Sequence, residues 1–226
     1  IKKGHANIVS VEKDGKVLYK KDDCTEAAQG ADRSLLNIKD ILEFATIADI
    51  EDIREPLQKQ IECNSAISDA GLAGDWGACI GKTLNETQGD LLRTKAKAAA
   101  AAGSDARMSG CELPVIIVSG SGNQGITASM PVITYARELG KTQEELYRAL
   151  CVSNLIALHE KTGIGKMSAF CGAMCAGSAA GAAIAYLQGA DFQTISETII
   201  SSLGIVSGMV CDGAKPSCAA KIAAAV

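Results

Sequence analysis

Aromatic side chains are scarce in this sequence. Phenylalanine, tyrosine and tryptophan make up 4% of its 226 residues, whereas hydrophobic residues make up 47% and glycine occurs 23 times. Because aromatic rings usually contribute much of the packing of a core, this composition argues against aromatic anchors. It favours helices that pack closely through small side chains. The length allows one large domain, or one domain with a small appendage.

The sequence also lacks an excess of positive charge, a triad-forming histidine and a secretory signal. The net charge of −4 gives no indication of binding to nucleic acid or to an anionic membrane surface. The histidines, His5 and His159, show no spacing to a carboxylate and a serine or cysteine that indicates a triad. Nine cysteines are an odd number, so a reducing cytoplasm is expected rather than a disulfide framework.

No complete nucleotide-binding motif is found. The run Gly120–Gly125 matches G-x-G-x-x-G, but no second strand with an acidic end follows it. The run Gly163–Lys166 fails as a P-loop, because Glu160 and Met167 replace the required glycine and serine or threonine. Glycines ahead of a helix still expose backbone N–H groups that suit a substrate carboxylate, with Asn123 as a further donor. A simple tight turn is the alternative.

The hydrophobic patterning predicts a mainly α fold with an N-terminal β-hairpin. Two β-branched runs flank Asp14-Gly15, a strong hairpin signal, and residues 1–33 are assigned to this hairpin and a linker. Residues 34–226 are expected to form one helical domain. The segment 167–188 is long enough to span a membrane, but alanine, glycine and serine dominate it. We therefore expect a buried helix and no membrane contact.

Single residues predict several helix boundaries. Pro56 suits the first turn of a new helix, and Gly103 suits the end of one. Thr142 and Glu145 are spaced as a capping box at the start of another helix. Residues 113–118 form a short apolar run that fits either a strand or the start of a buried helix.

The second half of the chain carries a cluster of cysteines. Cys171 and Cys175 are close in sequence, and Cys211 and Cys218 enclose a loop that contains Pro216. Thiolates brought together from loops are soft ligands that select zinc, copper or an iron–sulfur cluster. The spacing departs from zinc fingers and ribbons, which pair close cysteines at both ends of the motif. The alternative is that these cysteines are free and packed as small hydrophobic residues.

Three blocks of this chain together resemble one protein family. They are Cys-Gly-Ala-Met-Cys-Ala-Gly at 171–177, Cys-Asp-Gly-Ala-Lys-Pro-Ser-Cys-Ala-Ala-Lys at 211–221, and Val-Ser-Gly-Ser-Gly-Asn-Gln-Gly-Ile-Thr-Ala-Ser-Met-Pro-Val at 118–132. They are similar to the α-chain domain of iron–sulfur L-serine dehydratases, and most similar to the L-cysteine desulfidase branch, from about Ser34 onward. The resemblance implies a helical fold and an oxygen-sensitive [4Fe–4S] lyase. Such an enzyme converts L-serine or L-cysteine into pyruvate and ammonia, with loss of hydroxide or sulfide.

The resemblance also implies roles for particular residues. Cys171, Cys211 and Cys218 are the implied cluster ligands, which leave one iron open for the substrate. Cys218 lies closer to Cys211 than its counterpart does in bacterial serine dehydratases. Independently of the resemblance, Lys166 lies in a glycine-rich loop five residues before Cys171 and is the candidate catalytic residue, with a solvated loop lysine as the alternative. The expected substrate-binding residues are Ser119, Gly120, Ser121, Gly122, Asn123, Gln124 and Gly125.

The desulfidase branch carries a further cysteine in an N-terminal Gly-Cys-Thr-Glu-Pro segment that this sequence lacks. We therefore expect a fragment that folds but is inactive alone. A homodimer, or association with a missing N-terminal region, would complete it. The expected ligand is a small L-amino acid. The competing hypothesis is a non-enzymatic helical domain whose cysteines hold structural zinc or remain free.

Overall fold

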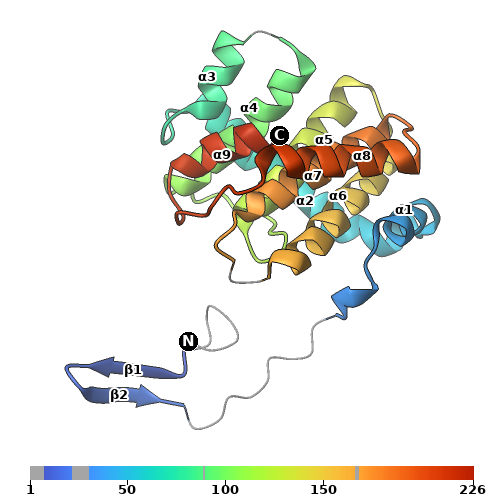
Figure 1. Ribbon diagram of the computed structural model, residues 1–226. Coiled ribbons are helices and arrows are strands. Elements are labelled where there is room, and N and C mark those ends of the chain that lie inside the picture. The colour runs from blue at the N-terminus through green and yellow to red at the C-terminus, as the bar shows by residue number, and fades with distance from the viewer. Residues whose placement is uncertain (1–7, 22–30, 89, 166–167) are drawn as a thin grey trace. The chain divides into compact units, whose positions relative to one another are not determined.

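The computed structural model contains a small strand pair followed by a helical unit (Figure 1). Its internal contacts divide the chain into two compact units, residues 1–35 and 36–226, two residues beyond the predicted division. The predicted fold class, mainly α with an N-terminal β-hairpin, is confirmed. The structure describes residues 8–21, 31–88, 90–165 and 168–226.

The hairpin of the first unit is built around its two-residue turn. Strands β1 (Ser10–Lys13) and β2 (Lys16–Lys20) pair in antiparallel fashion. Asp14 and Gly15 join them with φ angles of 51° and 75°, and a type I′ turn requires positive φ at both positions. The prediction made from Asp14-Gly15 is therefore confirmed. Both strands are exposed along their whole length, and the 3₁₀ helix Arg33–Leu35 ends the unit.

Polar caps begin several helices of the second unit. Asn37, Asp49, Thr142 and Asp191 each accept a hydrogen bond from a backbone N–H of the following first turn, where helices leave donors unpaired. The capping box of Thr142 and Glu145 is present in full, as predicted. The helices are α1 (Ile38–Ile47), α2 (Ile50–Ala73), α3 (Ile80–Thr87), α4 (Leu92–Met108), α5 (Gly122–Glu138), α6 (Gln143–Ile164), α7 (Gly172–Leu187), α8 (Phe192–Val206) and α9 (Ser217–Ala225).

Helix α7 lies at the centre of the helical unit and contacts α5, α6, α8 and α9 (Figure 1). It consists mostly of alanine, glycine and serine and is buried over most of its length. A β-carbon at Gly177 would lie 2.6 Å from the carbonyl oxygen of Ala225, so α9 crosses α7 at backbone distance. This is the close packing that the scarcity of aromatic residues predicts. Within the described residues, no helix is both long and apolar enough to cross a membrane.

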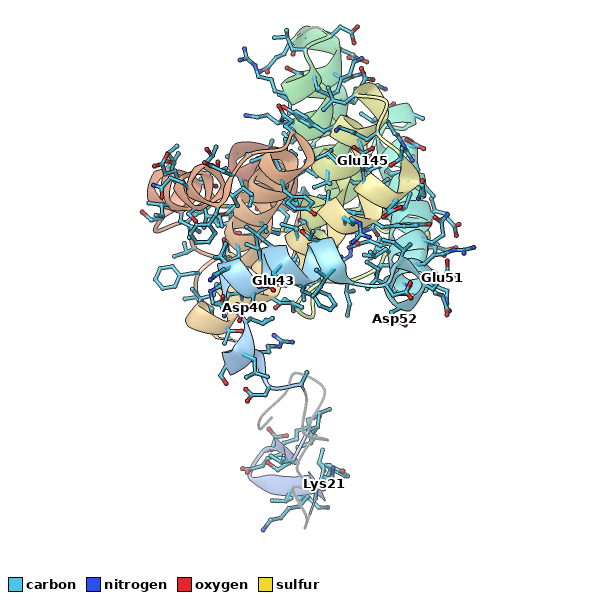
Figure 2. The ribbon with its side chains drawn as sticks, turned by 90° about the vertical axis from the view of Figure 1, so that its right-hand side faces the viewer. Lys21, Asp40, Glu43, Glu51, Asp52 and Glu145 are labelled. Carbon is cyan, nitrogen blue, oxygen red and sulfur yellow. The ribbon has the colours of Figure 1, made fainter. Side chains whose placement is uncertain are left out.

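The acidic residues of α1 and of the start of α2 lie on the outside of this unit (Figure 2). Asp40 and Glu43 are exposed, whereas Ile41 on the same helix is buried. Glu51 and Asp52 occupy the first turn of α2, where negative charge interacts favourably with the helix dipole. The apolar face of α1 packs on the bundle, and its charged face is exposed to solvent.

Two predicted helix boundaries are wrong. Pro56 lies inside α2, which continues past it because the following turns bury Leu57 and Ile61. Gly103 lies inside α4, where a β-carbon would be 3.0 Å from Ile126 Cγ2. A proline costs about 3 kcal/mol and a glycine about 1 kcal/mol in a helix interior. Packing against neighbouring helices outweighs these local costs.

Candidate functional site

A cavity of about 220 Å³ lies where the starts of α5, α7 and α9 approach one another. The structure thus brings together the predicted cysteines and most of the predicted substrate loop. Of that loop, Ser119, Gly122 and Gly125 are not part of the lining. The lining consists of Arg107, Gly120, Ser121, Asn123, Gln124, Cys171, Gly172, Ala173, Cys211, Gly213, Ala214, Cys218 and Ile222.

The glycine-rich run forms a tight turn and then the first turn of α5. Val118 and Ser121 exchange two backbone hydrogen bonds of 3.2 and 3.1 Å. Between them Ser119 and Gly120 have φ angles of 52° and 83°, so a non-glycine residue is held in the left-handed region, as is common at functional sites. Ser121 then caps α5 by accepting from the N–H of Gln124. Of the glycines expected ahead of a helix, only Gly120 precedes it, because α5 begins at Gly122 and includes Gly125.

The segment before this turn is neither of the two alternatives considered for residues 113–118. It is an extended chain whose backbone bonds to a side chain instead of a neighbouring strand. The N–H of Ile116 donates to Asn64 Oδ1 at 2.9 Å, and Asn64 Nδ2 donates to the Ile116 carbonyl and to Ser129 Oγ. A β-carbon at Gly125 would be 2.0 Å from the Ile116 oxygen. The hydrogen bonds to Asn64 and the lack of a side chain at Gly125 together fix where the Ile116 backbone lies against α2 and α5.

A short antiparallel contact joins the segments that carry Cys171 and Cys211. Phe170 pairs with Val210 as an isolated β-bridge. The N–H of Cys171 donates to Met209 at 2.9 Å, and the N–H of Cys211 donates to Ala169 at 2.7 Å. Cys171 and Cys211 both line the cavity of about 220 Å³, and Cys171 also lines a neighbouring apolar cavity together with Phe170. The extended chain also explains why α7 begins at Gly172 and not near residue 167.

Charged hydrogen bonds hold the loop between Cys211 and Cys218. Asp212 pairs with Lys221 and, at 3.0 Å, with Lys215, and these ammonium groups hold its pKa well below the usual range. Lys221 also donates to the Val210 carbonyl at 3.1 Å. Cys218 contacts the Gly213 carbonyl at 3.6 Å. The loop therefore closes on itself and presents Cys218, in the first turn of α9, to the cavity.

The cysteine thiols lie in a shared electrostatic environment. Burial raises the pKa of Cys171, and the neighbouring Cys211 and Cys218 raise it further, while Lys221 lowers it. A bound metal ion would offset this effect on Cys171, because a coordinated thiol is deprotonated. Cys175 differs: burial, with the nearby Glu160, raises its pKa to about 11. It lines a second, apolar cavity of about 250 Å³, which also includes Cys171 in its lining, and it does not line the first one.

The ends of the helices at the cavity favour negative charge. Unpaired N–H groups give the start of a helix a partial positive charge, and α5, α7 and α9 all begin at the lining. Gly172 at the start of α7 packs directly on Gln124, since a β-carbon there would be 2.5 Å from Nε2. The arrangement suits a carboxylate, thiolates or both.

Sequence reasoning missed two cations in this region, Arg107 and Lys221. Arg107, in the last turn of α4, lines the cavity and donates from Nη1 to Asn123 Oδ1 at 3.2 Å. Its role depends on a contact between α4 and α5 that no local motif signals. Lys221 lies inside the 211–221 block, so its spacing of three residues from Cys218 was available as a signal.

The three cysteines of this cavity are its candidate metal ligands. In the described residues, no three histidine, cysteine, aspartate or glutamate side chains are placed to hold one metal ion. A zinc ion requires all its sulfur ligands at about 2.3 Å from one point. Cys171, Cys211 and Cys218 all line the same cavity, and a cluster bonds each thiolate to a different iron, so its ligands need not meet at one point. Lys166 lies outside the described residues, and its predicted catalytic role stays a prediction.

The helical unit brings three helix starts and three cysteines to one cavity, and comparison with known families gives its class. The family model for the serine dehydratase alpha chain matches residues 15–226. The chain therefore belongs to the serine dehydratase alpha-chain family, as the three sequence blocks predict.

Curated relatives are similar to this chain over nearly its whole length. A UPF0597 protein of Desulfitobacterium hafniense is 59% identical over 98% of this chain and 52% of its own length. UPF0597 proteins of Finegoldia magna and Treponema denticola are 52% and 47% identical over 100% and 98% of this chain, and over 54% and 53% of their own lengths. The chain spans about half the length of these relatives. No solved structure matches it.

Proposed function

We propose that this chain carries the cluster-binding and substrate-binding part of an iron–sulfur lyase that acts on a small L-amino acid. The supporting observation is that Cys171, Cys211 and Cys218 share one cavity with the turn and first residues of α5. L-Cysteine would lose its α-proton and hydrosulfide, together one hydrogen sulfide, and L-serine would lose its α-proton and hydroxide, together one water. The resulting enamine would tautomerise and react with water to give pyruvate and ammonia.

The residues of the chain divide this work. Cys171, Cys211 and Cys218 would hold a [4Fe–4S] cluster, which when bound supplies a Lewis-acidic iron. The N–H groups at the start of α5 would orient the substrate carboxylate. The cavity volume of about 220 Å³ is below the usual range for drug-sized ligands, about 300–1,000 Å³, which suits an amino acid. Lys166 is retained as the candidate base for the α-proton.

Cysteine substitutions combined with visible spectroscopy test the cluster assignment. The protein is reconstituted with iron and sulfide without oxygen, and broad visible absorbance that bleaches in air is expected. Cys171→Ala, Cys211→Ala and Cys218→Ala should each lower that absorbance. Cys63→Ala on α2, which is not part of the cavity, should leave it unchanged. Colourless, zinc-loaded protein, or equal absorbance in all four variants, would contradict the assignment.

Pyruvate formation tests the reaction itself. Reconstituted protein is assayed with L-serine and L-cysteine, and the ratio of kcat/KM identifies the preferred leaving group. For comparison, an enzyme that loses a positioned base typically catalyses its reaction about 10² to 10⁴ times more slowly. Pyruvate formation that the cysteine variants retain at full rate would show that the cluster is not required.

A further inference from the structure

The guanidinium of Arg107 lies at the cavity with no carboxylate partner among the described residues. Its one hydrogen bond there is the donation from Nη1 to Asn123 Oδ1. An arginine side chain carries five N–H donors and no acceptor. Most of its donors are therefore left for another partner, and the bond to Asn123 fixes where the guanidinium lies.

Gly122 allows this position. A β-carbon at Gly122 would be 2.3 Å from Arg107 Nε and 2.8 Å from the guanidinium carbon. Any larger residue at the first position of α5 would displace the side chain. The guanidinium therefore rests directly on the positive end of α5, so that its full positive charge lies beside the partial positive charge of the helix start. This arrangement favours an anion between them.

Gln124 also lines the cavity, and it offers a hydrogen-bond acceptor where Arg107 offers donors. Its side chain is 9% exposed, and Oε1 has no hydrogen-bond partner among the described residues. Gly172 packs against its amide and limits where it can move. A buried acceptor without a donor costs about 1–3 kcal/mol, so a ligand that donates to Oε1 would relieve a real penalty.

We propose that Arg107 binds the α-carboxylate of the amino acid and that Gln124 Oε1 accepts a hydrogen bond from its α-ammonium. This inference rests on the proposed function and specifies how the substrate is recognised. The wall of the cavity formed by α4 and α5 recognises the part that all α-amino acids share. The wall that carries the cysteines is left for the side chain. The cavity then selects zwitterions over simple acids and simple amines.

Binding of inert ligands tests the two contacts separately from the reaction. L-Alanine has no β-leaving group, L-alaninamide lacks the carboxylate and propionate lacks the ammonium. Titration calorimetry on the wild-type protein should show L-alanine binding at least about tenfold more tightly than either analogue. Arg107→Gln should weaken L-alanine about tenfold to a hundredfold and leave L-alaninamide unchanged. Gln124→Met should weaken L-alanine and leave propionate unchanged.

Arg93→Gln is the matched control, because Arg93 is exposed at the other end of the same helix. If Arg107→Gln does not fold, Arg107→Lys keeps the charge without the bidentate fork and should bind L-alanine several-fold more weakly.

Wild-type affinity in either Arg107 variant or in Gln124→Met would overturn the inference. If the wild type binds L-alanine selectively but takes up no iron–sulfur cluster on reconstitution, the proposed function fails alone. A wild-type protein that binds no amino acid would overturn both.

Discussion

At the scale of single residues, Glu160 is the unusual ionisable group. It lies on α6, where Ser178 of α7 donates to its Oε1 at 3.0 Å. Its Oε2 is buried without a partner among the described residues. Burial raises the pKa of this carboxyl from its ordinary value of 4.5 to about 8. A neutral carboxylic acid at pH 7 is the physical consequence.

This pKa predicts how stability depends on pH. Between pH 4.5 and about 8 the folded chain keeps a proton on Glu160 that the unfolded chain has released, so the free energy of unfolding falls as pH rises. The decline is about 1.4 kcal/mol for each pH unit in this range, and therefore on the order of several kcal/mol in total. Glu160→Gln should flatten this decline in urea unfolding measured from pH 5 to 9. Glu43→Gln, at an exposed site, should not, and equal slopes in all three proteins would contradict the assignment.

At the scale of elements, contact between α2 and α4 depends on glycine. A β-carbon at Gly71 would be 2.0 Å from the carbonyl oxygen of Ala102 and 2.4 Å from its carbon. These are backbone atoms of a buried helix, so they cannot move aside as a flexible side chain would. The two helices would have to separate, which would disturb the packing of α4 against α3 and α5.

Gly71→Ala is therefore expected to lower the free energy of unfolding by about 2–3 kcal/mol or more, as overpacked cores do. Gly204→Ala provides the matched control, because this glycine is exposed in α8 with no atom near its added β-carbon. That substitution should stabilise the protein by up to about 1 kcal/mol through helix propensity. Chemical denaturation measures both, and a Gly71 variant as stable as the Gly204 variant would refute the packing argument.

At the scale of the whole molecule, the two units differ in what they bury. The hairpin exposes both of its strands, whereas the apolar core is formed by residues from Ile41 onward. A chain that begins at residue 36 should therefore keep its helical circular dichroism and its midpoint of thermal unfolding. A lower midpoint, or loss of a cooperative transition, would show that the helical unit needs the first 35 residues for its stability.

Much of the candidate site could be predicted because its parts are short and local. The glycine-rich run, the Cys171 block and the loop that ends at Cys218 each carry their signal within a few residues. Arg107 could not be found in this way, since its importance comes from the packing of α4 against α5. The roles of the predicted ligands and of Lys166 stay predictions until the spectroscopic and kinetic measurements are made.

By itself, the sequence determined the features that neighbouring residues decide. The turn at Asp14-Gly15 and the capping box at Thr142 and Glu145 follow from backbone preferences and hydrogen bonds over two to four residues. Only the tertiary structure decided that α2 continues through Pro56 and that α4 continues through Gly103, because burial on other helices outweighs local propensity. It alone decided that the starts of α5, α7 and α9 meet at one cavity. That meeting depends on contacts between residues about 50 to 100 positions apart, which no local pattern can specify.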